Sequence, residues 1–172
     1  ALSVNGEPTS AKAFGEVVDL IGRIRRDLAV PDAVKTVLIT NGSLMHRVAV
    51  RSAVRAMAAL SGEVWFKIDR ATDSGMRRIN STRSSMARVR TNLEIAARAC
   101  PTWIQTCVFA IDGEAPDGAE RDAYLDLLRE SLKSGLPLKG VLLYGLARPS
   151  LQPEAGRLRA LPAAWLESFA TE

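Results

Sequence analysis

A lysine and a carboxylate share one side of an apolar stretch, Glu63–Asp69, in the middle of the chain. Because side chains alternate along a strand, Trp65, Lys67 and Asp69 would point the same way. Opposite charges on an interior strand are costly unless they pair or line a polar cavity. The two residues could therefore bind a charged ligand or form a structural ion pair, and the sequence leaves both possibilities open.

Further polar residues follow two other apolar stretches. Glu7, beside Gly6, offers a carboxylate suited to a ligand ammonium group. Thr40 and Asn41 offer a hydroxyl and an amide directly after an apolar run. Gly-Glu-Pro and Asn-Gly are also ordinary turn sequences, so a purely structural role is the competing interpretation.

Three more side chains could reach the same place. Gln105 lies inside an apolar run and could face a cavity, and Arg78 and Arg148 could bind a carboxylate or a phosphate. The single histidine, His46, is interpreted as a surface residue. The sequence has neither a Ser–His–Asp order nor a metal-ligand spacing.

The two cysteines, Cys100 and Cys107, match no zinc or redox motif and are interpreted as small buried residues. Free thiols suit a reducing compartment, so a cytoplasmic location is expected.

Five short apolar stretches are predicted to be strands, and longer helical patterns alternate with them. This alternation favours right-handed crossovers and a parallel sheet, with all strand-to-helix loops at one edge. The predicted strands are 2–5, 36–40, 63–69, 103–111 and 139–146.

Helices are predicted between these strands. The first is amphipathic, with Phe14, Val17, Val18, Ile24 and Leu28 among the apolar residues of its buried face. The expected N-caps of successive helices are Thr9 or Ser10, Asp73, Ser84 or Ser85, and Asp117. The strand 103–111 is expected to be continuous.

The length and composition are those of an ordinary globular protein. The 172 residues, 47% of them hydrophobic, suit one domain over 1–172, with 151–172 as a C-terminal extension. No apolar run has membrane-spanning length. The net charge of +4 comes mainly from arginines without interleaved aromatics, so nucleic-acid binding has only weak support.

Taken together, these motifs resemble the radical S-adenosylmethionine family. The resemblance is carried by Asn5–Thr9, Leu38–Gly42, Lys67–Asp69, Arg77–Asn80 and Ile104–Thr106, in this order. It implies an α/β fold, a partial parallel (β/α) barrel of which about five of six units are present.

The resemblance also implies roles for individual residues. Gly6 and Glu7 match the segment that holds the methionyl ammonium of S-adenosylmethionine, and Thr40 and Asn41 match positions near the same cofactor. Lys67 and Asp69 match positions near its carboxylate and ribose, with Arg78 as a second candidate cation. Gln105 matches a position facing the barrel interior. Glu7 and Lys67 are thus expected to hold opposite charges of one ligand.

The chain departs from the family at the iron–sulfur site. The family binds a [4Fe–4S] cluster through C-x₃-C-x₂-C, which would lie before Ala1, and Cys100 and Cys107 have the wrong spacing. The chain is therefore expected to be an N-terminally truncated piece, inactive alone. The full-length enzyme would take an electron from a donor and cleave the cofactor to a 5′-deoxyadenosyl radical. The sequence does not indicate the substrate.

Two other functions stay open. One is a Schiff-base lyase on a (β/α) barrel, with Lys67 as nucleophile and Asp69 as proton shuttle. The other is a non-catalytic, degenerate barrel that binds a nucleotide or a protein partner through an open sheet edge at Leu2–Asn5.

Overall fold

Four parallel strands form the central sheet of the protein, for which a computed structural model describes residues 1–172 apart from 4–5, 81–83 and 148–152. In sheet order and in chain order alike, the strands are β1 (Thr36–Thr40), β2 (Gly62–Lys67), β3 (Thr102–Cys107) and β5 (Leu138–Tyr144). Each neighbouring pair is parallel. The parallel α/β sheet predicted from the sequence is confirmed.

Within its described residues, the first predicted strand contributes one bridge beside β1. Leu2 pairs in parallel with Leu38. Leu2 N donates to Val37 O at 2.6 Å, and Ile39 N donates to Leu2 O at 3.1 Å. Residues 4–5 of this predicted strand lie outside the described part of the chain.

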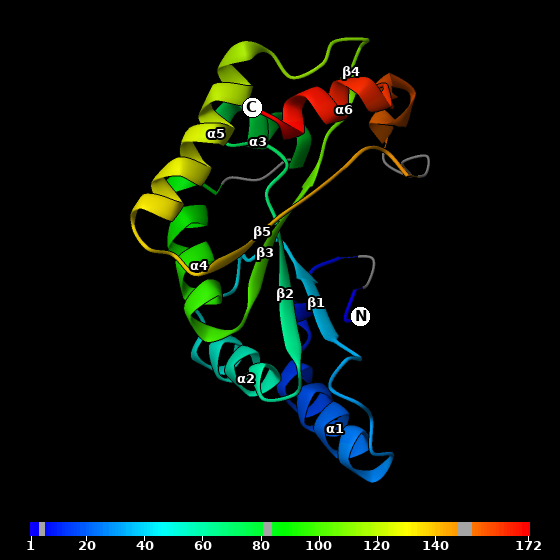
Figure 1. Cartoon of the computed structure of the whole chain (residues 1–172), viewed down its shortest axis with the longest axis vertical. Coiled ribbons are helices and arrows are strands. Elements are labelled where there is room, and N and C mark those ends of the chain that lie inside the picture. Colours follow the sequence, from blue (N-terminus) through cyan, green and yellow to red (C-terminus); the bar gives the residue numbers. More distant parts are fainter. Residues whose placement is uncertain (4–5, 81–83, 148–152) are drawn as a thin grey trace.

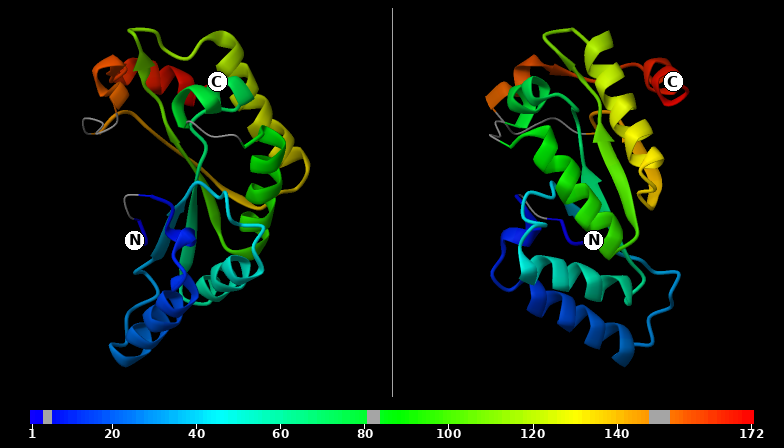
Figure 2. Two further views of the ribbon diagram at one scale, coloured as in Figure 1. Left: turned by 180° about the vertical axis from the view of Figure 1, so that it is seen from behind. Right: turned by 90° about the vertical axis from the view of Figure 1, so that its left-hand side faces the viewer.

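Helices α2, α4 and α5 lie on one side of the sheet, as Figures 1 and 2 show. Strands that follow one another in both chain and sheet order place right-handed crossovers on the same face. This is the arrangement of a partial β/α barrel. The described residues form α1 (Phe14–Asp27), α2 (Val48–Ala58), α3 (Asp73–Asn80), α4 (Met86–Ala99), α5 (Gly118–Lys133) and α6 (Ala163–Ala170), with 3₁₀ turns η1 (Pro8–Ser10) and η2 (Pro153–Arg157).

The two faces of the sheet differ in burial. The helix-covered face is the core, where Leu38, Val64, Phe66 and Ile104 are fully buried. The opposite face, which we call the inner face, is mostly half-buried. It consists of Ile39, Trp65, Lys67, Trp103, Gln105, Cys107, Leu142 and Tyr144.

Two of the expected helix caps are confirmed and two are wrong. Asp117 Oδ1 accepts from Glu120 N at 2.8 Å, and Ser85 accepts at the start of α4. Helix α1 has no side-chain cap, because its N-cap residue is Ala13, while the expected caps Thr9 and Ser10 lie within η1, which Glu7 caps. Thr72 replaces Asp73 at the start of α3, because its hydroxyl accepts from Gly75 N at 2.9 Å.

The strand expected over 103–111 is divided. After β3 ends at Cys107, residues 108–109 separate it from β4 (Ala110–Ile111). Strand β4 pairs antiparallel with β6 (Leu158–Arg159), outside the parallel sheet. The pairing partner comes from the C-terminal segment, so the strand's own sequence could not reveal the break.

The apolar face expected for α1 is only partly buried. Phe14 and Val18 lie in the core, whereas Val17, Ile24 and Leu28 are exposed, Leu28 to 72%. Helix α1 packs on α2 rather than directly on the sheet, and this leaves part of its apolar surface free.

Within the described ranges, no helix combines the length and apolar character that a membrane span requires.

Candidate functional site

Glu7 joins the loop before α1 to the carboxyl end of β1. Its Oε1 accepts hydrogen bonds from the hydroxyls of Thr9 and Thr40, both at 2.6 Å, and from Thr9 N at 3.1 Å. Its Oε2 accepts from Asn41 N at 2.8 Å. Three predicted site residues are thus in contact, and Gly6, with φ of 135°, precedes them in an exposed turn.

The loop after β1 requires a glycine. Gly42 has φ of 69°, and a Cβ there would lie 2.1 Å from the ring of Phe66. Gly42 N donates to Thr40 Oγ1 at 2.9 Å, and Asn41 Oδ1 accepts from Ser43 N at 2.9 Å. The turn therefore presents Asn41 N to Glu7, while the Asn41 side chain is used within the turn itself.

Lys67 and Asp69 form an ion pair at the carboxyl end of β2. The Nζ to Oδ2 distance is 3.6 Å, and the side chains are 36% and 8% exposed. Asp69 Oδ1 accepts from Cys107 N at 2.8 Å. The buried carboxylate is thus held by β3, while the lysine remains accessible from the inner face.

Lys67 is held as an ammonium ion. Burial, the largest single influence, lowers the pKa of Lys67, but Asp69, Tyr144 and Cys107 together raise it above its ordinary value. Burial is also the main cause that raises the pKa values of the Cys107 thiol and the Tyr144 phenol. The site therefore presents one cation surrounded by neutral groups and a paired carboxylate.

Two polar atoms of the inner face lack a hydrogen-bond partner in the described part of the chain. They are Gln105 Oε1 and Trp65 Nε1, both shielded from solvent. Gln105 stands opposite Lys67 in the β2–β3 register, and Trp65 stands opposite Trp103. Unpartnered buried polar atoms are uncommon in native proteins and often mark functional positions.

One of the two predicted arginines, Arg78, lies apart from these groups. Arg78 is exposed on α3, and among the described residues no ion pair joins it to Glu7 or Asp69. Arg148, the other predicted anion-binding arginine, falls outside the described residues.

The Glu7 group and the Lys67 group are neighbours along one edge of the sheet. Thr40 is paired with Phe66, the residue before Lys67, so both groups stand where adjacent strands end. Their hydrogen bonds and ion pairs involve different residues within the described chain. That Glu7 and Lys67 hold one ligand between them stays a prediction.

Three contributors were not predicted as site residues. Thr9 shares the Glu7 carboxylate, Cys107 N fixes Asp69, and Tyr144 reaches Lys67 from the end of β5. Strand alternation could have identified Tyr144, since it belongs to the same face as Cys107. The donor role of Cys107 N depends on register, which the sequence does not give.

The cysteines cannot form one metal site. Both are buried, Cys100 just before β3 and Cys107 at its end. Burial raises the pKa of the Cys100 thiol to about 12. In the described segments, no three His, Cys, Asp or Glu residues are grouped to hold a metal ion.

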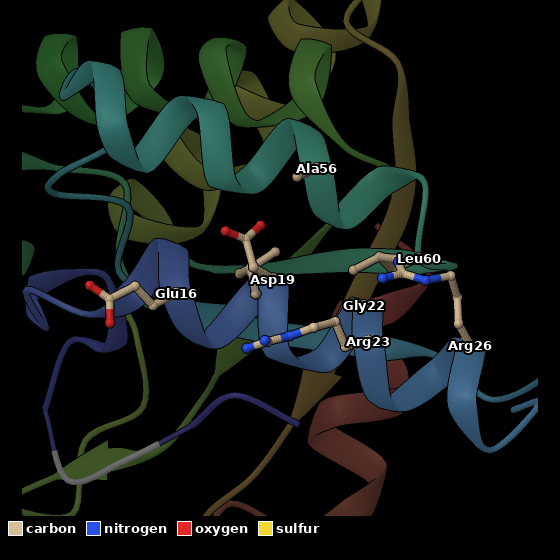
Figure 3. Close-up of a pocket in the computed structure, with 8 residues that line it drawn as sticks. Glu16, Asp19, Gly22, Arg23, Arg26, Ala56 and Leu60 are labelled. Atoms are coloured by element: carbon tan, nitrogen blue, oxygen red, sulfur yellow. The ribbon is translucent and has the colours of Figure 1, made fainter.

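A groove of about 630 Å³ lies elsewhere, between α1 and α2 (Figure 3). Charged residues of α1, among them Asp19 and Arg23, line it together with Ala56 and Leu60. It belongs to the helical layer, so it is separate from the strand ends that carry the candidate site.

Comparison with known proteins identifies a fold but not a family. No family model matches the chain, and no curated protein matches it in sequence. A solved structure of TYW1 with a lysine-pyruvate adduct bound is similar, with a TM-score of 0.65 and 16% identity. The match covers 98% of this chain and 47% of that chain, so the chain spans about half the length of the TYW1 structure.

TYW1 is a radical S-adenosylmethionine enzyme. At this identity the similarity shows the fold alone. Together with the sequential parallel strands, it assigns the chain a partial β/α barrel fold like that of TYW1.

Proposed function

We propose that the carboxyl edge of this sheet binds S-adenosylmethionine, as part of a radical S-adenosylmethionine enzyme. One observation carries the proposal. A carboxylate and an accessible ammonium, Glu7 and Lys67, stand at the ends of adjacent parallel strands in a barrel-type sheet similar to that of TYW1. Ligands of parallel β/α folds bind at this edge.

The available hydrogen-bonding capacity fits such a ligand. Among the described residues, Glu7 Oε2 accepts one hydrogen bond, so it can accept another from the methionyl ammonium. Lys67 would pair with the carboxylate. Gln105 Oε1, which has no partner among the described residues, would accept from a ribose hydroxyl, and Asp69 would keep Lys67 in place. When bound, the cofactor would supply a sulfonium whose carbon–sulfur bond can be cleaved reductively.

The described residues do not fit a [4Fe–4S] cluster, because they offer no group of three suitable ligands. Reductive cleavage is therefore not assigned to the residues of this chain. We propose binding as its activity, with any cluster ligands supplied from outside the described residues.

Calorimetric titration with S-adenosylmethionine tests the proposal. Binding should weaken about tenfold or more in both Glu7→Gln and Lys67→Met, since each loses a charge-assisted contact. Glu16→Gln, an exposed carboxylate of α1, is the matched control. Adenosine, which lacks the ammonium and carboxylate groups that Glu7 and Lys67 would bind, is the ligand control and should bind equally to all variants. Absence of binding to the intact chain, or equal affinities in all variants, would contradict the proposal.

A Schiff base at Lys67 is the second candidate, because the TYW1 structure contains a lysine-pyruvate adduct. A nucleophilic lysine needs a lowered pKa, whereas that of Lys67 is raised. Incubation with pyruvate and borohydride, followed by peptide mass analysis, separates the two functions. A reduced adduct on the peptide containing Lys67 would favour the lyase, and an unmodified peptide would favour cofactor binding.

A further inference from the structure

Asp69 lies beyond the regular end of β2, so other contacts must hold it. Ile68 N donates to Gln105 O at 3.0 Å, which continues the strand for one residue. The Thr106 hydroxyl then donates to Ile68 O at 2.9 Å, and Cys107 N donates to Asp69 Oδ1 at 2.8 Å. Two consecutive residues of β3 thus fix the backbone before Asp69 and its carboxylate.

The Thr106 hydroxyl is itself held by Tyr124 of α5. Their oxygens are 2.6 Å apart. Because the Thr106 proton is donated to Ile68 O, the Tyr124 hydroxyl must be the donor of this bond. Thr106 is 1% exposed and Tyr124 5%. Burial raises the pKa of Tyr124 to about 12, so it stays protonated and able to donate.

The Tyr124 ring is in turn packed against α6. Its centroid lies 5.8 Å from that of Phe169, which lies 5.4 Å from that of Trp165. An ion pair between Arg121 and Glu172, at 2.8 Å, joins α5 to the end of the chain. Figure 1 shows α6 beside the N-terminal end of α5. The Tyr124 ring, and with it the hydroxyl, is therefore held in place by the C-terminal segment.

We propose that Tyr124 is a positioning residue for the Lys67–Asp69 pair. Its hydroxyl orients Thr106, Thr106 holds the segment that carries Asp69, and Asp69 places the Lys67 ammonium at the inner face. The proposal deepens the proposed function and rests on it for the identity of the ligand, but not for the geometry. A phenylalanine would fill the same apolar space, so the hydroxyl is the group that matters.

The test follows the ammonium group of Lys67 by ¹⁵N NMR, with the signal assigned by its loss in Lys67→Arg. Ion pairing slows hydrogen exchange of this group. We expect exchange to be about three- to tenfold faster in Tyr124→Phe and in Thr106→Val, and unchanged in Thr106→Ser, which keeps the hydroxyl. Leu132→Ala, on the exposed side of α5, is the control.

A double-mutant cycle distinguishes positioning from general stability. Asp69→Asn should speed exchange more than Tyr124→Phe, and combining the two should add nothing further, because both act through Asp69. Additive effects, or a Tyr124→Phe variant with lowered melting temperature and unchanged Lys67 exchange, would overturn the proposal. If Tyr124→Phe does not fold, the Thr106→Val and Thr106→Ser pair decides alone.

Titration of the same variants with S-adenosylmethionine separates the two proposals. Faster Lys67 exchange with about three- to tenfold weaker binding supports both. Faster exchange with unchanged binding supports the positioning role and contradicts the proposed ligand site. Unchanged exchange overturns the positioning role whatever the affinity.

Discussion

At the scale of single residues, Glu7 connects structure to proposed function. Among the described residues, its carboxylate accepts two hydrogen bonds from Thr9 and one each from Thr40 and Asn41, which lie 33 and 34 positions further along the chain. Such a residue contributes to stability even without a ligand. A loss of binding on its mutation therefore has to be compared with the loss of stability.

Glu7→Gln should lower the free energy of unfolding by about 1–3 kcal/mol, because all partners of Glu7 are donors and an amide nitrogen would face one of them. Urea unfolding measures this, with exposed Glu114→Gln as the control. An equal stability of both variants would mean that the Thr9 and Thr40 contacts contribute little.

The charge of Lys67 predicts a dependence on pH. A pKa raised on folding gives stability that is complete below the ordinary value of 10.5 and is lost as the pH rises through the folded value. The stability difference between the native chain and Lys67→Met should be constant from about pH 7 to pH 9 and shrink above about pH 10.5. Unfolding at several pH values measures it, with exposed Lys12→Met as the control. A difference that grows with pH would contradict the pairing.

The residue types of the site were predictable, but their partners were not. Alternation of side chains along 63–69 places Lys67 and Asp69 on one face of the strand. Thr40 and Asn41 are identified because they stand at the end of a predicted strand. The contact between Glu7 and Thr40 and the bond from Cys107 N to Asp69 depend on how distant segments meet. Local sequence contains no signal for either.

At the scale of elements, the neighbouring residues Thr72 and Asp73 bind the N-termini of two different helices. Thr72 caps α3, while Asp73 Oδ1 accepts from Met86 N at 2.7 Å, at the first residue of α4. The sequence offers two adjacent caps for one helix. Which of the two residues caps α3 depends on where α4 begins. The expectation that Asp73 caps α3 is therefore wrong.

The turn after β1 gives a prediction with a matched control. Gly42 and Gly113 both have positive φ, but a Cβ meets Phe66 only at Gly42. Gly113→Ala should cost about 1 kcal/mol from backbone strain alone. Gly42→Ala should cost roughly 2 kcal/mol more, because Phe66 must move within the core. Denaturant midpoints compare the two, and equal costs would show that Phe66 adapts freely.

At the scale of the whole molecule, the order of the strands supports the proposed ligand site at the carboxyl edge of the sheet. Helices on one face leave the inner face to side chains, and the strand ends gather the charged groups at one edge. Regular alternation of strands and helices made this architecture predictable. The C-terminal segment was not predictable, since β6 pairs with β4 and α6 packs on α5 through single residues such as Phe169.

The two cysteines lie in different apolar clusters, so their labelling rates compare the local stability of two parts of the fold. Cys100 belongs to the main core, whereas Cys107 belongs to a smaller cluster with Phe109 and Ile111. Small clusters open by local fluctuations more easily than the core. Thiol labelling of the native protein near pH 8 should therefore modify Cys107 roughly tenfold faster than Cys100. Cys100→Ser and Cys107→Ser assign the two rates. Equal rates would mean that the carboxyl end of the sheet, with its candidate site, unfolds only together with the whole molecule.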